Sequence, residues 1–350
     1  MELTRRAAIA ILGQGILAVS TDWGLTTARA SGNTVALGML SPNLVSSIHY
    51  IAKKTGAYER HGLTIIERPI PSGESSAGIE ELLRGHLNIF IGAGAEVARM
   101  NSNYAAGNNT PPIIVIQGGT PGATSLVLRH EWEGKSFDDL KGRPLKIAVS
   151  SPSSIHLSLF RGYLRERYGT SANLGWQFLN MEGGDMAPML TAKQMDGFLH
   201  SEPATSSAIS SGAGFLFMNA GRGDMGAKAK MVPITFTSAN RSWLTSNKDT
   251  ADRFLAALSD ANMAFTKMPK PQMVNILAEW ARLPNAIVSL AYDRIDPRMA
   301  MTVEGAQAWW DLIGRVIRER GEISAKLQFK DVFATDYLLG DKSSSSKGAA

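Results

Sequence analysis

Residues 34–69, TVALGMLSPNLVSSIHYIAKKTGAYERHGLTIIERP, decide the fold class. The apolar run Thr34–Leu40 predicts a strand, Asn43–Lys54 predicts a helix that ends near Gly56, and Leu63–Pro69 predicts a second strand. Two strands separated by a helix of this length favour a parallel βαβ unit. We therefore expect an α/β protein.

The same alternation continues beyond this stretch and then begins again. Further strands are expected at 87–91 and 113–117, and a short strand at 125–128 leads into a polar turn. A second α/β series follows it over 145–237, after which the chain is mainly helical. Val303, Ala306, Trp310, Ile313 and Ile317 recur at helical spacing and predict one apolar, core-facing helix side.

Two α/β series followed by a helical return predict two lobes, each a mainly parallel sheet flanked by helices. Ligands of open α/β sheets bind at the carboxyl ends of the strands, which places the site in the cleft between the lobes. Expected crossing strands near 124–128 and 231–236 give the lobe bounds. The expected parts are lobe 1 at 31–126 plus 234–335, lobe 2 at 127–233, and a flexible tail at 336–350.

The first thirty residues have the pattern of a cleaved export signal. A basic start with Arg5 and Arg6 precedes the apolar run Ala7–Ser20, which is too short to span a bilayer as a helix. Small residues around Arg29 suit cleavage near Ala30. Thr4-Arg5-Arg6 also resembles a twin-arginine signal, so both export routes stay open. No later segment is apolar and long enough to span a membrane, so we expect an unanchored protein in the periplasm.

The composition excludes several function classes. Cysteine is absent, which excludes disulfides, thiol catalysis, thiolate metal sites and lipid anchoring through a cysteine. The net charge of +5 is spread along the chain without a basic cluster, which argues against nucleic-acid binding. The six histidines show no metal-ligand spacing, and phosphate-loop, dinucleotide and nucleophile-elbow patterns fail. We expect no metal, no cofactor and no catalysis.

Four segments, in order along the chain, carry a resemblance to a known family. They are GAYERHGL (56–63), LLRGHLNI (82–89), FDDLKGR (137–143) and MDGF followed by SEP (195–203). Together they resemble the nitrate/sulfonate/taurine-type solute-binding proteins of ABC transporters. Asn88 stands where that family usually has Asp, and Lys193 where it usually has Gly.

The resemblance implies a type II periplasmic-binding fold and a monomeric receptor that delivers its ligand to an ABC importer permease. Helix N-termini favour a small organic anion, and a nearby glutamate would extend this to a zwitterion of the taurine type. Two alternatives stay open. One is an enzyme on the same fold, as in relatives that make a thiamin pyrimidine precursor, although those carry a cysteine-rich motif. The other is a ligand-sensing domain.

Candidate ligand-binding residues lie where strands give way to helices. Small residues there leave backbone N–H groups free to face an anion, although Ser and Gly also cap helices without any ligand. Thr124 lies at the first crossing strand, His156 follows a serine run, and Glu202 either caps a helix or accepts an amine. The candidates are Ser41, Asn43, Ser72, Gly73, Ala93, Gly94, Thr124, Ser151, Ser153, Ser154, His156 and Glu202.

Overall fold

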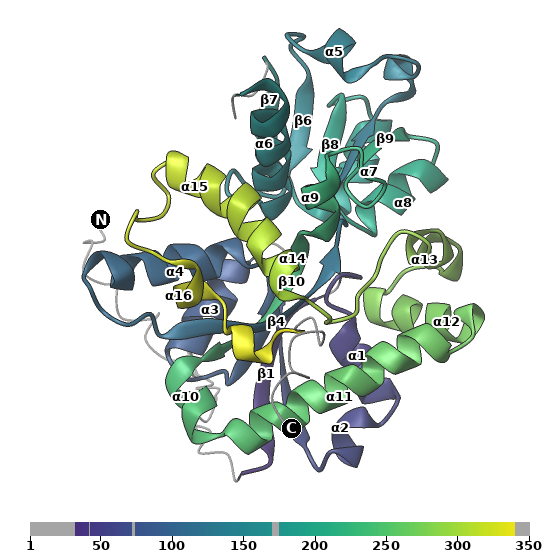
Figure 1. Ribbon diagram of the computed structural model, residues 1–350. Coiled ribbons are helices and arrows are strands. Elements are labelled where there is room, and N and C mark those ends of the chain that lie inside the picture. The colour runs from purple at the N-terminus through teal and green to yellow at the C-terminus, as the bar shows by residue number, and fades with distance from the viewer. Residues whose placement is uncertain (1–31, 42, 72–73, 170–174, 340–350) are drawn as a thin grey trace, which may run out of the picture.

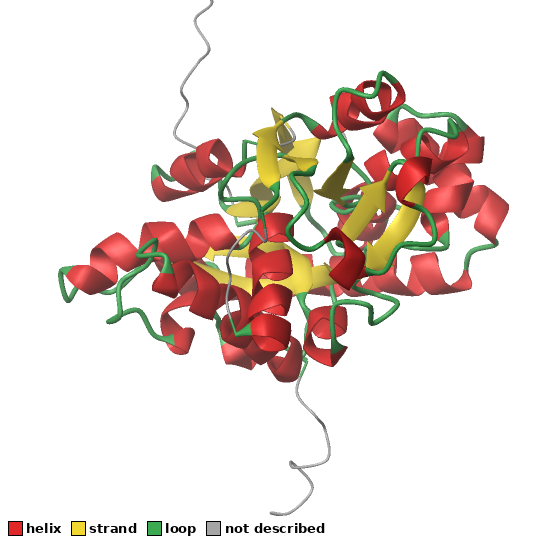
Figure 2. Cartoon of the chain, turned by 90° about the horizontal axis from the view of Figure 1, so that it is seen from above, coloured by secondary structure: helices red, strands yellow, loops and turns green. Residues whose placement is uncertain are grey.

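Two five-stranded sheets organise the chain in the computed structural model, which describes residues 32–41, 43–71, 74–169 and 175–339. Figure 1 shows the two sheets in separate lobes, one above the other, and Figure 2 shows helices around both. The expected export signal, most of the expected tail, Ser72 and Gly73 lie outside the described residues. At the end of the described part, the backbone N–H of Leu339 donates to Met301 O at 3.0 Å.

The first lobe holds a sheet in which helices alternate with the parallel strands. Apolar residues of β1 are buried on both faces, as expected for a strand covered by helices on both sides. The strands, in sheet order, are β2 (Thr64–Pro71), β1 (Thr34–Ser41), β3 (Ile89–Gly92), β10 (Pro233–Asn240) and β4 (Ile113–Pro121). The helices between them are α1 (Ile48–Lys54), α2 (Ala57–Arg60), α3 (Ser75–Leu83) and α4 (Ala95–Ala106).

The second lobe repeats this arrangement. Its strands, in sheet order, are β7 (Gln177–Asn180), β6 (Lys146–Val149), β8 (Gly197–His200), β5 (Ser125–Leu128) and β9 (Phe215–Asn219). Its helices are α5 (Phe137–Leu140), α6 (Ile155–Tyr168), α7 (Gly183–Thr191), α8 (Ala204–Ser210) and α9 (Ala227–Met231).

Each sheet is mixed, with a parallel half and an antiparallel half. β1 pairs in parallel with β2 and β3, and β6 pairs in parallel with β7 and β8. β10 and β5, the strands that follow the two crossings, each pair with both of their neighbours in antiparallel fashion. Each of these two strands enters its sheet from the other lobe and so runs against the direction set by the βαβ units.

The C-terminal third is helical and packs against both lobes. α11 (Lys248–Lys267) and α12 (Lys270–Ala281) pack on α1, whereas α14 (Val303–Trp309) packs on α9. No helix among the described residues is both long and apolar enough to cross a membrane. The remaining helices are α10 (Arg241–Ser246), α13 (Asn285–Tyr292), α15 (Arg315–Glu319) and α16 (Phe329–Val332).

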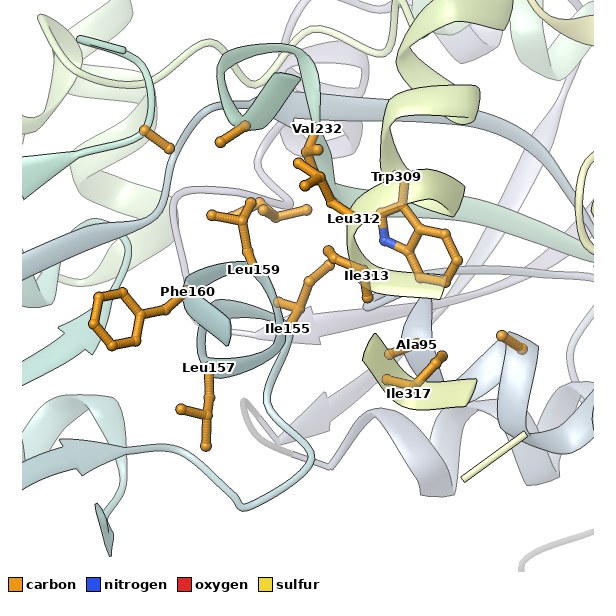
Figure 3. Close-up of a cluster of buried hydrophobic side chains, with 14 of the residues drawn as sticks. Ala95, Ile155, Leu157, Leu159, Phe160, Val232, Trp309, Leu312, Ile313 and Ile317 are labelled. Carbon is orange, nitrogen blue, oxygen red and sulfur yellow. The ribbon is translucent and has the colours of Figure 1, made fainter. Parts of the chain in front are cut away.

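One hydrophobic core continues from lobe to lobe through the C-terminal helices. The π-helical segment 310–314, between α14 and α15, contacts both α4 and α6. In Figure 3, Ile155 of α6 lies beside Ile313, and Ala95 of α4 lies beside Ile317. Trp309 is fully buried, whereas its neighbour Trp310, about 100° further round the helix, is only half-buried.

Candidate functional site

A cavity lies between the lobes, where the ends of several strands and helices meet. The first lobe lines it with residues such as Asn43, Ser46 and Ala93, and the second with Ser151 and His200. The volume of this cavity is about 90 Å³, which restricts an occupant to a small solute.

Four helices point their N-terminal ends at this cavity. Ser75 begins α3, Glu96 lies in the first turn of α4, Ser154 caps α6, and Glu182 precedes α7; all four line the cavity. Free backbone N–H groups and the positive ends of the helix dipoles favour an acceptor or an anion here. The local sequence explains this geometry. A short strand and then a loop of small residues precede α4, and the same pattern precedes α6.

The wall from the first lobe is held by hydrogen bonds around Asn43. Its Nδ2 donates to Leu40 O at 3.0 Å, and its Oδ1 accepts from Ser46 N at 2.8 Å. Trp280 Nε1 donates to Asn43 O at 2.5 Å, which ties the loop to α12. The Ser46 hydroxyl, in a fully buried side chain, has no hydrogen-bond partner. It is therefore available to a bound solute.

Buried His156 and half-buried His200 line the cavity from the second lobe. The rings of His156 and His200 have centroids 5.0 Å apart, and His156 Nδ1 lies 2.9 Å from Thr124 Oγ1. Burial lowers the pKa of both imidazoles, and for His156 the neighbouring His200 lowers it further. Both rings are therefore neutral near pH 7 and can accept as well as donate hydrogen bonds.

A network of ion pairs borders the cavity on the α4 side. Arg99 Nη2 lies 2.6 Å from Glu322 Oε2 and 3.3 Å from Ser153 O, so it connects α4 with the C-terminal region and with the α6 loop. Its Nη1 lies 3.5 Å from Glu96 Oε1. Burial raises the pKa of Glu96, and the charge of Arg99 opposes this effect. Glu96 Oε2 is buried without a hydrogen-bond partner.

The structure brings five of the twelve predicted site residues to the cavity lining. Their contact with a ligand stays a prediction. They are Asn43, Ala93, Ser151, Ser154 and His156.

Four other predicted residues lie behind the lining. Gly94 caps α4 against the Phe236 ring, Thr124 supports His156, and Ser153 faces a neighbouring hollow beside Arg99. Glu202 is considered below. Ser72 and Gly73 lie outside the described residues, and Ser41 is described only as the last residue of β1.

Glu202 is a helix-capping and inter-lobe residue in this structure. Its Oε2 accepts from Ser206 N at 2.9 Å in the first turn of α8, and its Oε1 lies 3.4 Å from Arg294 Nη1. Burial raises the pKa of this carboxyl, against the opposing effects of Ser206 and Arg294. Capping was one of the two expected roles, and the geometry favours it over an amine-binding role.

Several lining residues were missed by sequence reasoning. Glu96, Glu182 and His200 bring charge and imidazole chemistry to the cavity, and Ser46 and Ser75 bring hydroxyls. The signal for Glu96 and Ser75 was present, since both lie in the first turn of a helix that follows a small-residue loop. Glu182 and His200 gave a comparable signal, because each lies at the carboxyl end of a second-lobe strand.

The two departures from the family pattern have structural explanations. Asn88 Oδ1 accepts from Ala36 N at 2.8 Å, a bond that an Asp carboxylate would make equally well. Lys193 has φ of 57°, in the left-handed region where Gly is favoured. Both positions thus keep the backbone role that the family pattern assigns to them.

The family assignment follows from the comparison with known proteins. Residues 29–281 match the NMT1-like family. The chain belongs to the NMT1-like family. A comparison with curated protein sequences finds no match.

Solved structures similar to this NMT1-like protein share its two-lobed fold. The periplasmic aliphatic sulphonate-binding protein SsuA of Escherichia coli superimposes with a TM-score of 0.69 at 19% identity, over 86% of this chain and 92% of that chain. The periplasmic nitrate-binding protein NrtA of Synechocystis gives 0.67 at 16% identity, over 87% of each chain. The alkanesulfonate-binding protein SsuA of Xanthomonas axonopodis, bound to MOPS, gives 0.65 at 17% identity, over 88% and 98%.

These matches support the expected two-lobed periplasmic-binding fold. One further similar structure is the ligand-binding component of an ABC-type import system from Staphylococcus aureus, at 12% identity and a TM-score of 0.66. At this identity the likeness establishes the fold, so the ligand must be argued from the cavity itself. Within the part of the chain that the structure describes, no group of three or more His, Asp or Glu side chains is placed to hold a metal ion.

Proposed function

We propose that this protein is a periplasmic receptor that captures a small organic anion or zwitterion and delivers it to an ABC importer. The observation that carries the proposal is the cavity between the lobes, which helix N-termini from both lobes line. In such an arrangement, closure of the lobes buries the solute and gives the importer a distinct ligand-bound form to recognise.

The division of the chain follows from the same proposal. We take 31–126 plus 234–335 as the first lobe and 127–233 as the second, except that Ser125 and Leu126 belong with β5 to the second lobe, and we take residues 1–30 as removed on export. The link from β4 to β5 and the link from β9 to β10 then act as the hinge. The connection from β4 to β5 is only residues 122–124, so bending is confined to a few backbone torsions.

Ligand-induced stabilisation tests the receptor proposal. The mature protein, stripped by unfolding and refolding, is melted with sulfonates, carboxylates, nitrate and amino acids. A solute at 100 times its dissociation constant stabilises the native state by about 2.7 kcal/mol, which raises Tm by a few degrees. Recovery of the solute unchanged supports a receptor. Chemical conversion of the solute would contradict the proposal.

A further inference from the structure

The cavity presents negative charge and carries no basic side chain among its described residues. Glu96 from the first lobe and Glu182 from the second both line it, whereas the lining includes no Lys or Arg. Burial keeps the two lining histidines neutral. An occupant with only negative charge would therefore meet two carboxylates and would depend on backbone N–H groups and hydroxyls alone.

Arg99, the cation that borders the cavity, makes its hydrogen bonds to groups other than Glu96, although its charge lies close to that carboxylate. Its guanidinium hydrogen-bonds Glu322 through Nε at 3.1 Å and through Nη2 at 2.6 Å, and Nη2 also donates to Ser153 O. The approach to Glu96 at 3.5 Å involves the remaining nitrogen and makes no hydrogen bond. Arg99 thus leaves part of the acceptor capacity of Glu96 unused.

Unused acceptors at the cavity wall indicate what a ligand must supply. Glu96 Oε2 is buried without a hydrogen-bond partner, and so is the hydroxyl oxygen of Ser46, whose side chain is fully buried. A buried polar atom without a partner costs free energy, and the cost is greater for a charged group. A donor on the occupant would remove this cost, and a positively charged donor would do so most effectively.

The position of the Glu96 and Glu182 carboxylates also makes closure of the cleft depend on the charge of the solute. Glu96 lines the cavity from the first lobe and Glu182 from the second, so closing of the cleft would bring the two carboxylates closer together. Like charges brought together repel, and a cation between them removes the repulsion. An anionic group at the other end of the same solute would still face the helix N-termini of α3 and α6.

We propose that the solute carries a protonated amine or amidinium that binds between Glu96 and Glu182, so that the receptor selects zwitterions over plain anions. This inference rests on the receptor function proposed above. It assigns the cationic end of the solute to Glu96, and not to Glu202, which is occupied by Ser206 and Arg294.

Matched pairs of solutes that differ only in the amine test the inference. The probes are taurine against isethionate and β-alanine against 3-hydroxypropanoate, each titrated calorimetrically into the full mature protein. We expect the amine to improve affinity about ten- to a hundredfold, as for a charge-assisted hydrogen bond. Glu96→Gln and Glu182→Gln should each reduce this preference, because glutamine keeps the shape and removes the charge.

Glu304→Gln is the matched control, because Glu304 lies in the first turn of α14 on the exposed surface. It should leave the preference for the amine unchanged. Equal or tighter binding of isethionate and 3-hydroxypropanoate would overturn the inference and leave the receptor function standing. An unchanged preference for the amine in both Glu96→Gln and Glu182→Gln would also overturn the inference and leave the receptor function standing. No binding of any of the four probes would count against both proposals.

Discussion

Arg294 reaches Glu202 across the two lobes, with 3.4 Å between Nη1 and Oε1. The same nitrogen donates to Ser206 Oγ at 2.8 Å. Arg294 follows α13, which packs with α12, whereas Glu202 and Ser206 belong to the α8 end of the second lobe. α13 also packs directly on α8, so the contact adds to the packing between the lobes, and we expect it to favour the closed arrangement.

Removal of this contact should shift the protein toward an open form. Arg294→Met leaves a buried carboxylate with Ser206 alone, so we expect a loss of about 1–2 kcal/mol in the free energy of unfolding. We also expect a larger radius of gyration by small-angle X-ray scattering. Arg84→Met removes an exposed ion pair within one lobe and should change either quantity by little. Equal effects of the two variants would exclude a role for Arg294 in closure.

The serine loop before α6 offers a second prediction, in which two neighbouring residues differ. Ser151 lines the cavity, whereas Ser153 faces the hollow beside Arg99, although their hydroxyl oxygens lie only 3.1 Å apart. Ser151→Leu should fill the cavity and abolish the Tm shift caused by a solute that stabilises the wild type. Ser153→Leu should keep that shift. Loss of the shift in both variants would mean that the whole loop, and not one side of it, contacts the solute.

The turn after α7 predicts a stabilising substitution. Lys193 has φ of 57°; its N–H donates to Leu190 O at 3.0 Å, and Gln194 N donates to Met189 O at 3.1 Å, which together form a Schellman cap. Glycine adopts this conformation without strain, so Lys193→Gly should gain about 0.5–1 kcal/mol in a urea melt. Lys193→Ala keeps the Cβ and should gain nothing. A glycine variant no more stable than the alanine variant would refute strain at this position.

The sequence pattern predicted the alternating elements because each of them depends on local periodicity. β5 has the predicted bounds, and β3 and β4 overlap the strands expected at 87–91 and 113–117. The half-burial of Trp310 was not predicted, because helical spacing from Ala306 and Ile313 allows either Trp309 or Trp310 on the core face. The antiparallel halves of the sheets depend on chain crossings, which no local pattern records.

The cavity was predicted less completely than the fold. Loops of small residues suggested Asn43, Ala93, Ser151 and Ser154, which line the cavity, and their contact with a ligand stays a prediction. The presence of Glu96 and Glu182 in one cavity lining depends on how the two lobes pack together. Likewise, Glu202 is adjacent to a strand end in sequence, but Arg294, far along the chain, determines its role. Long-range partners were therefore the missing information.

His49 links acid pH to stability. Its side chain is fully buried beside the Trp280 ring, both ring nitrogens lack hydrogen-bond partners, and Glu67 Oε1 is 4.0 Å away. Burial, with a smaller effect of the Lys53 charge, lowers the pKa of His49 to about 3, against 6.5 in an unfolded chain. Between pH 6.5 and 3, the unfolded state therefore binds a proton at His49, whereas the folded state does not. Stability is full above pH 6.5 and falls as the pH drops toward 3.

The expected slope from this one group is at most about 1.4 kcal/mol per pH unit between these limits. His49→Leu should remove that part of the slope in urea melts at pH 4.5 and 7, because leucine fills the apolar site and takes no proton. The other buried histidines, His156 and His200, still contribute in this variant, so the quantity to compare is the difference from wild type. His130→Leu, at an exposed site, is the control. A His49→Leu variant with the wild-type slope would show that water reaches the imidazole and lets it protonate in the folded state.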